Sequence, residues 1–399
     1  MSDPVDSYTE VTTQSWGSKI AGSLIGLVLG PLLVIGACIA LFWNEGRAAQ
    51  TARSLTEGAA IVIDVPPAPV SLANEGLLVH VTGDLKSATR LSDQDFAVTS
   101  DAVRLIRDVA MFQWKEESKS ETRKNAGGSE ETVTTYTYRR EWSGKPIDSS
   151  KFKQPGLHEN PPMTIKDRDV VSRDATLGAF RLGEQAIRRF NTDTRFEVDP
   201  SVAGPVRKTT GRPVNIAIGQ IYLSDDPGSP RIGDYRIGYR IVPVGTASMV
   251  ARQTGTELTG YPSKAGDVIL LAQTGSQSAA EMFKAAQDAN RILTWILRAV
   301  FTMLVFIGFV FSTRILVAIT DVLPFVGNLM QATTFAAALA LTAILAPLVI
   351  AVAWLFYRPM ISLGILAGGA ALAFAVSKLI GLRQKTMPPR VPLPKQAAH

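Results

Sequence analysis

The chain has 399 residues and a formal net charge of +6, and 46% of its residues are hydrophobic. The part from Trp43 to Asn290 carries 31 basic and 31 acidic side chains, so the positive excess lies outside it. A neutral central region without a basic, aromatic-interleaved patch argues against a nucleic-acid-binding protein. The single cysteine, Cys38, excludes an intramolecular disulfide.

Apolar segments at both ends of the chain indicate an integral membrane protein. A bilayer core about 30 Å thick needs about 20 helical residues, and each backbone amide inside it must be paired within its own helix. One charge-free segment lies near the N-terminus, and three apolar segments follow the polar central region. We therefore predict transmembrane helices over residues 20–42, 295–316, 335–357 and 360–380.

The polar parts of the chain complete the predicted topology. Residues 1–19 are predicted to be a polar, disordered cytoplasmic tail, and residues 381–399 to be a basic cytoplasmic tail. Lysines and arginines without acids after the last span favour a cytoplasmic C-terminus. Residues 43–277 are then a large β-rich extracytoplasmic domain. The fold class is an α+β membrane protein with four transmembrane helices.

Within the central region, alternating residues predict strands over 103–114 and 132–142, with a charged segment between them, so we expect a long hairpin with a solvated tip. Residues 175–190 have helical spacing.

A helix over residues 278–294 is predicted to connect the domain to the second span. Ser278 and Glu281 form a capping-box pattern, and no Gly or Pro follows until Gly308. Either this helix enters the membrane unbroken or it breaks near Asn290. Residues 317–334 are predicted to be a cytoplasmic loop or an interfacial helix.

Regularly spaced glycines predict close helix packing in two spans. Small residues four apart let another backbone approach, and packing drives helix association in lipid. Residue spacing alone leaves open whether they pack within or between chains. The predicted helix-packing residues are Gly22, Gly26, Gly30, Gly364 and Gly368.

Aromatic and charged residues gather at the predicted span ends. Trp and Tyr are typical of membrane interfaces, and long charged side chains near helix ends reach toward water. We apply the same interpretation to Arg298, which precedes the apolar core of the second span. The predicted membrane-interface residues are Trp43, Trp295, Arg314, Asp321, Trp354, Tyr357 and Arg358.

Sequence motifs for catalysis, cofactor binding or metal binding are missing. The chain has three histidines and neither a His-Glu-x-x-His pattern, a P-loop nor a dinucleotide fingerprint. We therefore predict no catalytic residues, no cofactor and no metal.

Several stretches in a shared order resemble the LUMA family, also called transmembrane protein 43. They include Asn44-Glu45-Gly46-Arg47, Ser54-Leu55-Thr56-Glu57-Gly58, Asn74-Glu75-Gly76, Leu91-Ser92-Asp93, Ser263-Lys264-Ala265-Gly266-Asp267 and Trp354-Leu355-Phe356-Tyr357-Arg358-Pro359. The resemblance implies four spans, an extracytoplasmic domain and self-association. For animal members it implies the endoplasmic reticulum and inner nuclear membrane, with lamins and emerin as partners. The low cysteine count and alanine-rich helices suggest a bacterial member in the inner membrane, where those partners do not apply.

These observations lead to one main hypothesis and two alternatives. The main hypothesis is a non-enzymatic membrane scaffold whose partners are itself, membrane lipids and membrane proteins that the sequence does not identify. The prolines inside the spans, Pro31 and Pro347, and the charges at the span ends suggest an ion channel or channel subunit as the alternative. A lipid-modifying enzyme is the third possibility.

Overall fold

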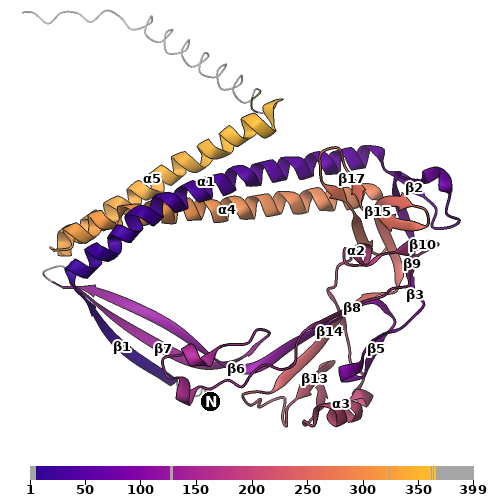
Figure 1. Ribbon diagram of the computed structural model, residues 1–399, viewed down its shortest axis with the longest axis horizontal. Coiled ribbons are helices and arrows are strands. Elements are labelled where there is room, and N and C mark those ends of the chain that lie inside the picture. Colours follow the sequence, from indigo (N-terminus) through magenta and orange to yellow (C-terminus); the bar gives the residue numbers. More distant parts are fainter. Residues whose placement is uncertain (1–5, 126–128, 323, 361, 363, 365–399) are drawn as a thin grey trace, which may run out of the picture.

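Three long helices dominate the computed structural model, which describes residues 6–125, 129–322, 324–360, 362 and 364. They are α1 (Trp16–Ile61), α4 (Ala279–Thr320) and α5 (Pro324–Tyr357), and they pack against one another as a bundle (Figure 1). Each is long and apolar enough to cross a membrane by length and composition. Two short helices, α2 (Glu184–Ile187) and α3 (Ala203–Thr210), lie among the strands.

The helix α4 runs unbroken from the domain into the apolar bundle. The predicted capping box begins it: the Ser278 hydroxyl accepts the Glu281 N–H, and the Glu281 carboxylate accepts the Ser278 N–H at 2.8 Å. Residues 278–294 and 295–316, predicted as two segments, therefore belong to one capped helix. Of the two sequence-based alternatives, the continuous helix is the one that forms.

The segment 317–334, for which the sequence left a loop or an interfacial helix open, is largely helical. The helix α4 continues to Thr320, and α5 begins at Pro324, so most of this segment is the first part of α5. The predicted fourth span at 360–380 falls almost wholly outside the described residues, as does the predicted tail at 381–399. Among the described residues, three helices meet the requirements for a span.

The larger sheet has eight strands in the order β1-β7-β6-β14-β13-β12, with β8 paired to β6 and β11 paired to β14. Their bounds are β1 Asp6–Gln14, β6 Ala102–Lys124, β7 Glu130–Ser143, β8 Arg168–Val171, β11 Thr194–Phe196, β12 Asn215–Ala217, β13 Gln220–Leu223 and β14 Tyr235–Pro243. One face of this sheet buries an apolar core around Leu105, Met111 and Ile237. A two-stranded sheet, β4 (Leu91–Asp93) with β5 (Val98–Ser100), packs beside it.

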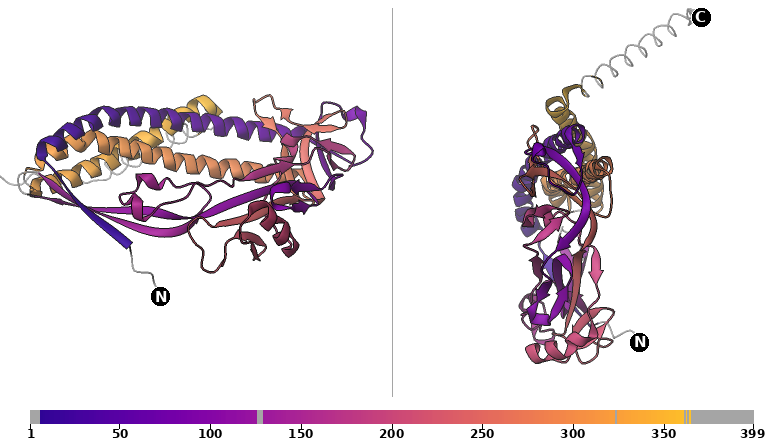
Figure 2. Two further views of the ribbon diagram at one scale, coloured as in Figure 1. Left: turned by 60° about the horizontal axis from the view of Figure 1, so that its bottom comes forward. Right: turned by 90° about the vertical axis from the view of Figure 1, so that its right-hand side faces the viewer.

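The predicted long hairpin is present, since β6 and β7 pair in register from Met111 opposite Ser143 to Lys124 opposite Glu130. Together with β1 they extend away from the rest of the sheet (Figure 1). We call β1, residues 112–124 of β6 and residues 130–142 of β7 the arm. The arm extends in the same general direction as the bundle (Figure 2) and meets it at the N-terminal end of α1 (Figure 1).

The segment predicted to be a disordered N-terminal tail contains a regular strand. Strand β1 pairs antiparallel with β7, from Asp6 opposite Tyr138 to Gln14 opposite Glu130. Its Thr-rich sequence has β-propensity but little apolar surface, so local composition resembles a solvated tail. The partner strand lies more than 110 residues away in the chain, which is why composition did not reveal the pairing.

The smaller sheet closes on itself. Its strands β15, β16, β10, β9 and β3 pair in a ring, because β15 pairs with both β16 and β3, and β19 and β2 add to the outside. The bounds are β2 Ile63–Val65, β3 Leu78–Ser87, β9 Ala175–Leu177, β10 Phe180–Leu182, β15 Gly245–Thr254, β16 Glu257–Thr259 and β19 Leu271–Thr274. We call this ring the barrel. Its core includes Val81, Leu177, Phe180 and Met249.

The helix predicted over residues 175–190 forms only at Glu184–Ile187. Residues 175–177 and 180–182 are instead β9 and β10 of the barrel, joined by a tight turn. Gly178 has φ +59°, the left-handed conformation that lets the chain turn tightly between the two strands. The barrel then joins the bundle through a shared core of Leu55, Val250 and Phe283, beside the short hairpin of β17 (Tyr261–Pro262) and β18 (Val268–Ile269).

Candidate functional site

Close backbone approach between α1 and α4 forms the middle of the bundle. A Cβ atom added at Gly30 would lie 2.6 Å from the Gly308 carbonyl oxygen, and one added at Gly26 would lie 2.8 Å from the Phe311 carbonyl oxygen. These glycines therefore pack against α4 of the same chain. In contrast, Gly22 and Gly364 have open space where a Cβ would be. Gly368 lies outside the described residues.

A buried ion pair joins the three helices where the apolar part of the bundle ends nearest the barrel. The Arg298 guanidinium donates to both carboxylate oxygens of Glu45, with Nε–Oε1 at 2.6 Å and Nη2–Oε2 at 2.8 Å. The indole N–H of Trp354 donates to the same carboxylate at 2.8 Å. The Glu45 side chain is fully buried, and that of Arg298 is 13% exposed. We call Glu45, Arg298 and Trp354 the Glu45 cluster.

The predicted interfacial position of Arg298 needs a correction. Its guanidinium does not reach toward water. It is held between Glu45 and the ring of Trp295, whose centroid lies 4.6 Å away. The buried Glu45 carboxylate on α1 accepts two charge-assisted hydrogen bonds from this guanidinium. These bonds are more favourable than exposure of the Arg298 side chain to water. Glu45 is 253 positions earlier in the chain, so spacing along the sequence did not suggest this pair.

The neighbours of Glu45 continue the polar contact between α1 and α4. The Asn44 amide donates to the Thr294 carbonyl at 3.2 Å. Arg47 donates to the side chains of Asn290 at 3.0 Å and Thr294 at 3.1 Å. Each residue of the Asn44-Glu45-Gly46-Arg47 motif therefore takes part in helix packing. The contribution of Gly46 is the space that it leaves for an aromatic ring.

That ring belongs to Tyr357 at the end of α5. A Cβ at Gly46 would lie 2.7 Å from a ring carbon of Tyr357, and the Phe42 and Tyr357 centroids are 5.3 Å apart. The Tyr357 carbonyl also accepts from Arg53. The structure thus brings the predicted interface residues Trp295, Trp354 and Tyr357 to one end of the bundle. Trp43 is exposed at this end, and Arg358 follows α5 there.

A second buried ion pair lies at the other end of the apolar bundle. The Lys19 ammonium contacts Asp321 at 2.5 Å and Glu130 at 2.8 Å, and the Lys19 and Asp321 side chains are at most 8% exposed. These residues come from the start of α1, the end of α4 and the tip of the arm. The Trp16 indole donates to the Ala318 carbonyl at 2.8 Å beside them. We call Lys19, Glu130 and Asp321 the Lys19 cluster.

The two clusters bracket the apolar part of α1. They are separated by 26 residues of helix from Lys19 to Glu45, about 39 Å at 1.5 Å per residue. A cavity of about 570 Å³ lies beside the Lys19 cluster, and Arg314 and Gly22 line it. Sequence reasoning singled out Asp321 and Arg314 but missed Lys19, Glu45 and Glu130. One feature of the sequence could have revealed these pairs. Each end of the apolar part of α1 carries a charge opposite in sign to the charge at the adjacent end of α4.

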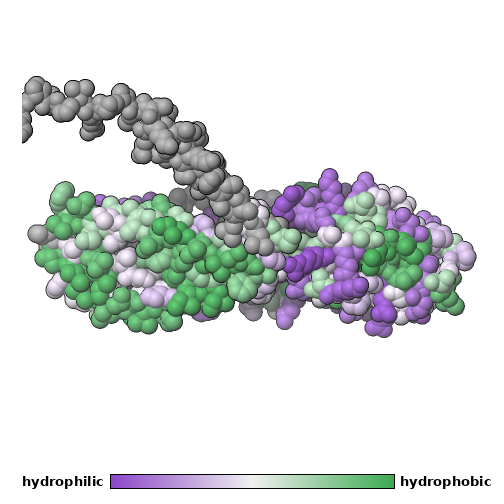
Figure 3. All heavy atoms as spheres, turned by 90° about the horizontal axis from the view of Figure 1, so that it is seen from above, coloured by the Kyte–Doolittle hydropathy of each residue, from purple (hydrophilic) through white to green (hydrophobic). Residues whose placement is uncertain are grey.

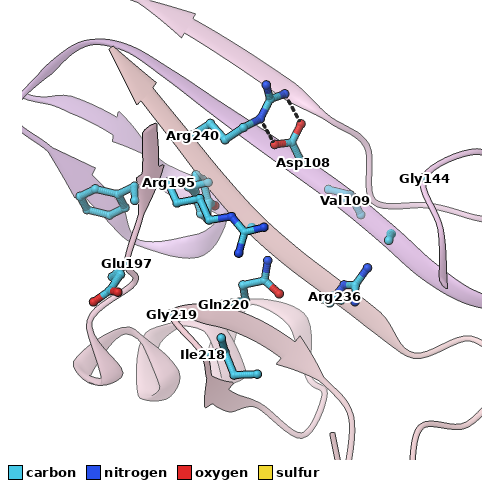
Figure 4. Close-up of a pocket in the computed structure, with 14 residues that line it drawn as sticks. Asp108, Val109, Gly144, Arg195, Glu197, Ile218, Gly219, Gln220, Arg236 and Arg240 are labelled. Carbon is cyan, nitrogen blue, oxygen red and sulfur yellow. Dashed lines mark hydrogen bonds and ion pairs between the residues drawn. The ribbon is translucent and has the colours of Figure 1, made fainter. Parts of the chain in front are cut away.

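A polar groove of about 660 Å³ lies on the larger sheet, lined by residues of β6, β11, β13 and β14 (Figure 4). Arg195, Arg236 and Arg240 surround a floor that includes Gly238. Arg240 forms a bidentate pair with Asp108, at 2.6 and 2.7 Å. The lining contains no Cys, Ser or His that a base would activate as a nucleophile.

Charged groups buried in the larger sheet have structural partners. Asp93 accepts from the Arg107 guanidinium and from the Tyr239 hydroxyl, each at 2.8 Å. Burial, with the neighbouring Asp93 carboxylate, raises the pKa of Tyr239 well above its ordinary value, so Tyr239 stays a neutral donor. Among the described residues, no group of three or more His, Cys, Asp or Glu is arranged to hold a metal ion.

Comparison with known proteins places the chain in a family. The family model of transmembrane protein 43 matches residues 111–359. Transmembrane protein 43 of Homo sapiens is 32% identical over 88% of this chain and 89% of its own length, and that of Mus musculus is 31% identical over 90% and 89%. The Drosophila melanogaster homologue is 28% identical over 86% and 92%. No solved structure matches. This membrane protein, with its three long apolar helices, therefore belongs to the transmembrane protein 43 family.

Proposed function

We propose that this protein is a non-enzymatic membrane scaffold that associates with a second copy of itself through the free edge of β1. The observation that carries the proposal is the position of this strand. β1 is the last strand in the order of the larger sheet, and among the described strands it pairs with β7 alone. Its other edge presents unpaired backbone N–H and C=O groups along nine residues.

The side chains of β1 leave that edge open. Native proteins protect long edges with charges, prolines or bulges. Here the charged side chains are held by the protein's own residues: Asp6 contacts His158 at 2.8 Å, and Glu10 contacts Lys153 at 2.7 Å. The strand has neither a Pro nor a Lys between Asp6 and Gln14. Its larger apolar side chains, Tyr8 and Val11, are 37% and 57% exposed.

A second copy is the partner that fits this edge best. Two identical edges pair about a two-fold axis, each strand antiparallel to the other, and the interface uses the same surface on both chains. Backbone hydrogen bonds supply the attachment, as in other cases of strand addition. Such a pairing would join the larger sheets of two chains into one continuous sheet and hold two helix bundles at a set separation.

The polar clusters support a structural role for the bundle. Each joins elements distant in sequence through charges that satisfy one another: Glu45 with Arg298, and Lys19 with Glu130 and Asp321. Groups tuned for catalysis combine a perturbed acid or base with access to substrate. A buried bidentate pair instead fixes the orientation of helices. Membrane lipids are the other proposed partner, through the exposed apolar helices.

The mass of the protein in native nanodiscs tests the proposal. Parent protein should have the mass of two or more chains. Val11→Lys places a charge at the free edge and should yield monomers with an unchanged circular dichroism spectrum. Ile218→Lys is the matched control, because Ile218 is an exposed apolar residue outside the edge. A monomeric parent, or a Val11→Lys protein that stays assembled, would refute the proposal.

A further inference from the structure

The N-terminal end of α1 is fixed to the arm. Strand β1 leads through the N-cap residue Ser15 directly into α1. β1 is itself paired along its whole length with β7. The Lys19 ammonium then contacts Glu130 at the tip of β7 at 2.8 Å. The start of this helix therefore lies where the arm ends, as Figure 1 shows.

The C-terminal end of the same helix is fixed to the barrel region. The Thr51 hydroxyl donates to Asp267 at 2.6 Å, and the hydroxyls of Ser54 and Ser263 are 2.8 Å apart. Leu55 is buried in the core shared with the barrel. The helix is continuous between these attachments. From Lys19 to Ser54 there are 35 residues, about 52 Å of helix.

The arm runs from the larger sheet to the N-terminal end of α1 and carries charged side chains along its length. β6 runs without interruption from the core of the larger sheet to the tip of the arm. Exposed ion pairs such as Lys115–Glu141, Lys119–Glu121 and Arg139–Glu117 line the arm. Charged side chains and open sheet edges are excluded from hydrocarbon, because the bilayer core offers no water to solvate them. The arm therefore lies in water over its full length.

We propose that the bundle lies along one face of the membrane, inserted into a single leaflet, with both ends of α1 on the side of the sheets. If α1 crossed the bilayer, the arm would cross beside it, and its charges exclude that. The other helices share this placement, since α4 is antiparallel to α1 and linked to it at both clusters. α5 begins beside the end of α4, and its end is held to α1 by the Trp354–Glu45 bond.

The surface of α1 fits a lipid leaflet as the partner. Its packed face carries Gly26 and Gly30 against α4. Its other face carries an apolar stripe at helical spacing, formed by Leu24, Val28, Leu32, Ile35 and Ile39, each 50–64% exposed. Figure 3 shows the molecule from the side opposite the arm, where hydrophobic residues cover the half formed by the bundle and hydrophilic residues gather on the other half.

Single-cysteine labelling in sealed membrane vesicles tests the inference. Cys38→Ala removes the one cysteine of the chain. Thr122→Cys then reports on the tip of the arm and Ser201→Cys on the body of the larger sheet, and both positions are exposed. A membrane-impermeant maleimide is added to right-side-out and inverted vesicles, with detergent-treated samples giving the total. Parent protein with Cys38 is the control for a position that the reagent should not reach without detergent.

We expect both reporters to react in the same vesicle preparation and to be protected at least tenfold in the other. Reaction of Thr122→Cys and Ser201→Cys from opposite faces would overturn the inference, because α1 would then cross the bilayer. Reaction of Thr122→Cys from both faces would also overturn it, since the arm would then line a water-filled passage. Resistance of each variant to limited proteolysis in detergent shows that it is folded. The result is independent of whether two copies associate through β1.

Discussion

The buried pair of Glu45 and Arg298 gives the sharpest prediction about stability. Glu45→Gln keeps the volume of the side chain and removes its charge. The Arg298 guanidinium, 13% exposed, would then keep its charge without the carboxylate that binds it at 2.6 and 2.8 Å. Breaking a buried pair in this way costs about 3–5 kcal/mol, because a charge stays desolvated and uncompensated. We expect a loss of about 3 kcal/mol in the free energy of unfolding, since the amide still accepts one hydrogen bond.

The double variant separates charge compensation from packing. Replacing both members by apolar residues of similar length, Glu45→Met with Arg298→Met, leaves no unpaired charge, and such replacements are often neutral. We expect the double variant to be more stable than Glu45→Gln alone. Denaturant unfolding in detergent micelles, followed by tryptophan fluorescence, measures both.

An exposed ion pair provides the control for this experiment. Arg291 and Asp288 are 2.6 Å apart on α4, with side chains 71% and 43% exposed. Exposed pairs contribute about 0–1 kcal/mol, so Asp288→Asn should change the stability little. The reasoning would be refuted if Glu45→Gln cost no more than Asp288→Asn, or if the double variant with Glu45→Met and Arg298→Met were no more stable than Glu45→Gln.

Three further predictions concern packing, helix capping and pH. Gly30→Leu should lower the unfolding temperature, with a cost of about 1–3 kcal/mol or more, because its Cβ would meet the Gly308 carbonyl. Gly22→Leu, placed in open space, should leave the unfolding temperature nearly unchanged. Ser278→Ala removes the N-cap of α4 and should cost about 1 kcal/mol, measured by chemical denaturation against Ser276→Ala, a serine outside the cap. Burial and the hydrogen bond to Glu116 raise the pKa of Tyr138 to about 12. The stability that Tyr138 contributes is present below pH 10 and is lost between about pH 10 and 12, and a fluorescence titration of Tyr138→Phe should show a shallower loss over that range if this assignment holds.

Local patterns were sufficient for elements whose interactions are close in sequence. The capping box of α4 involves residues three apart, and the β6–β7 hairpin joins neighbouring segments. Long apolar runs identified α1, α4 and α5, because a charge-free stretch of about 20 residues has few stable alternatives to a helix in an apolar environment. The expected helix over residues 175–190 failed because barrel pairing of β9 and β10 outweighed local spacing.

Contacts distant in the chain were beyond local reasoning. Glu45 and Arg298 are 253 positions apart, and Lys19 and Asp321 are 302 positions apart. Each residue alone looks like an ordinary charge at the end of an apolar run. Their pairing depends on the axial offset between α1 and α4. Close packing of Gly30 against Gly308 fixes this offset. The family resemblance pointed to the Asn44-Glu45-Gly46-Arg47 motif, and the structure supplied a contact for each of its residues.

The amino-acid sequence by itself determined that this is a membrane protein with long apolar helices, a β-rich polar region and membership in one family. These properties follow from composition, periodicity and motif order, which need no knowledge of partners. Only the tertiary structure decided that Gly26 and Gly30 of α1 face α4, that two ion pairs bracket the bundle and that β1 joins the arm. The reason is physical: a strand or a charged side chain takes its stability from whatever lies opposite it, and folding brings those partners together from more than 100 residues away.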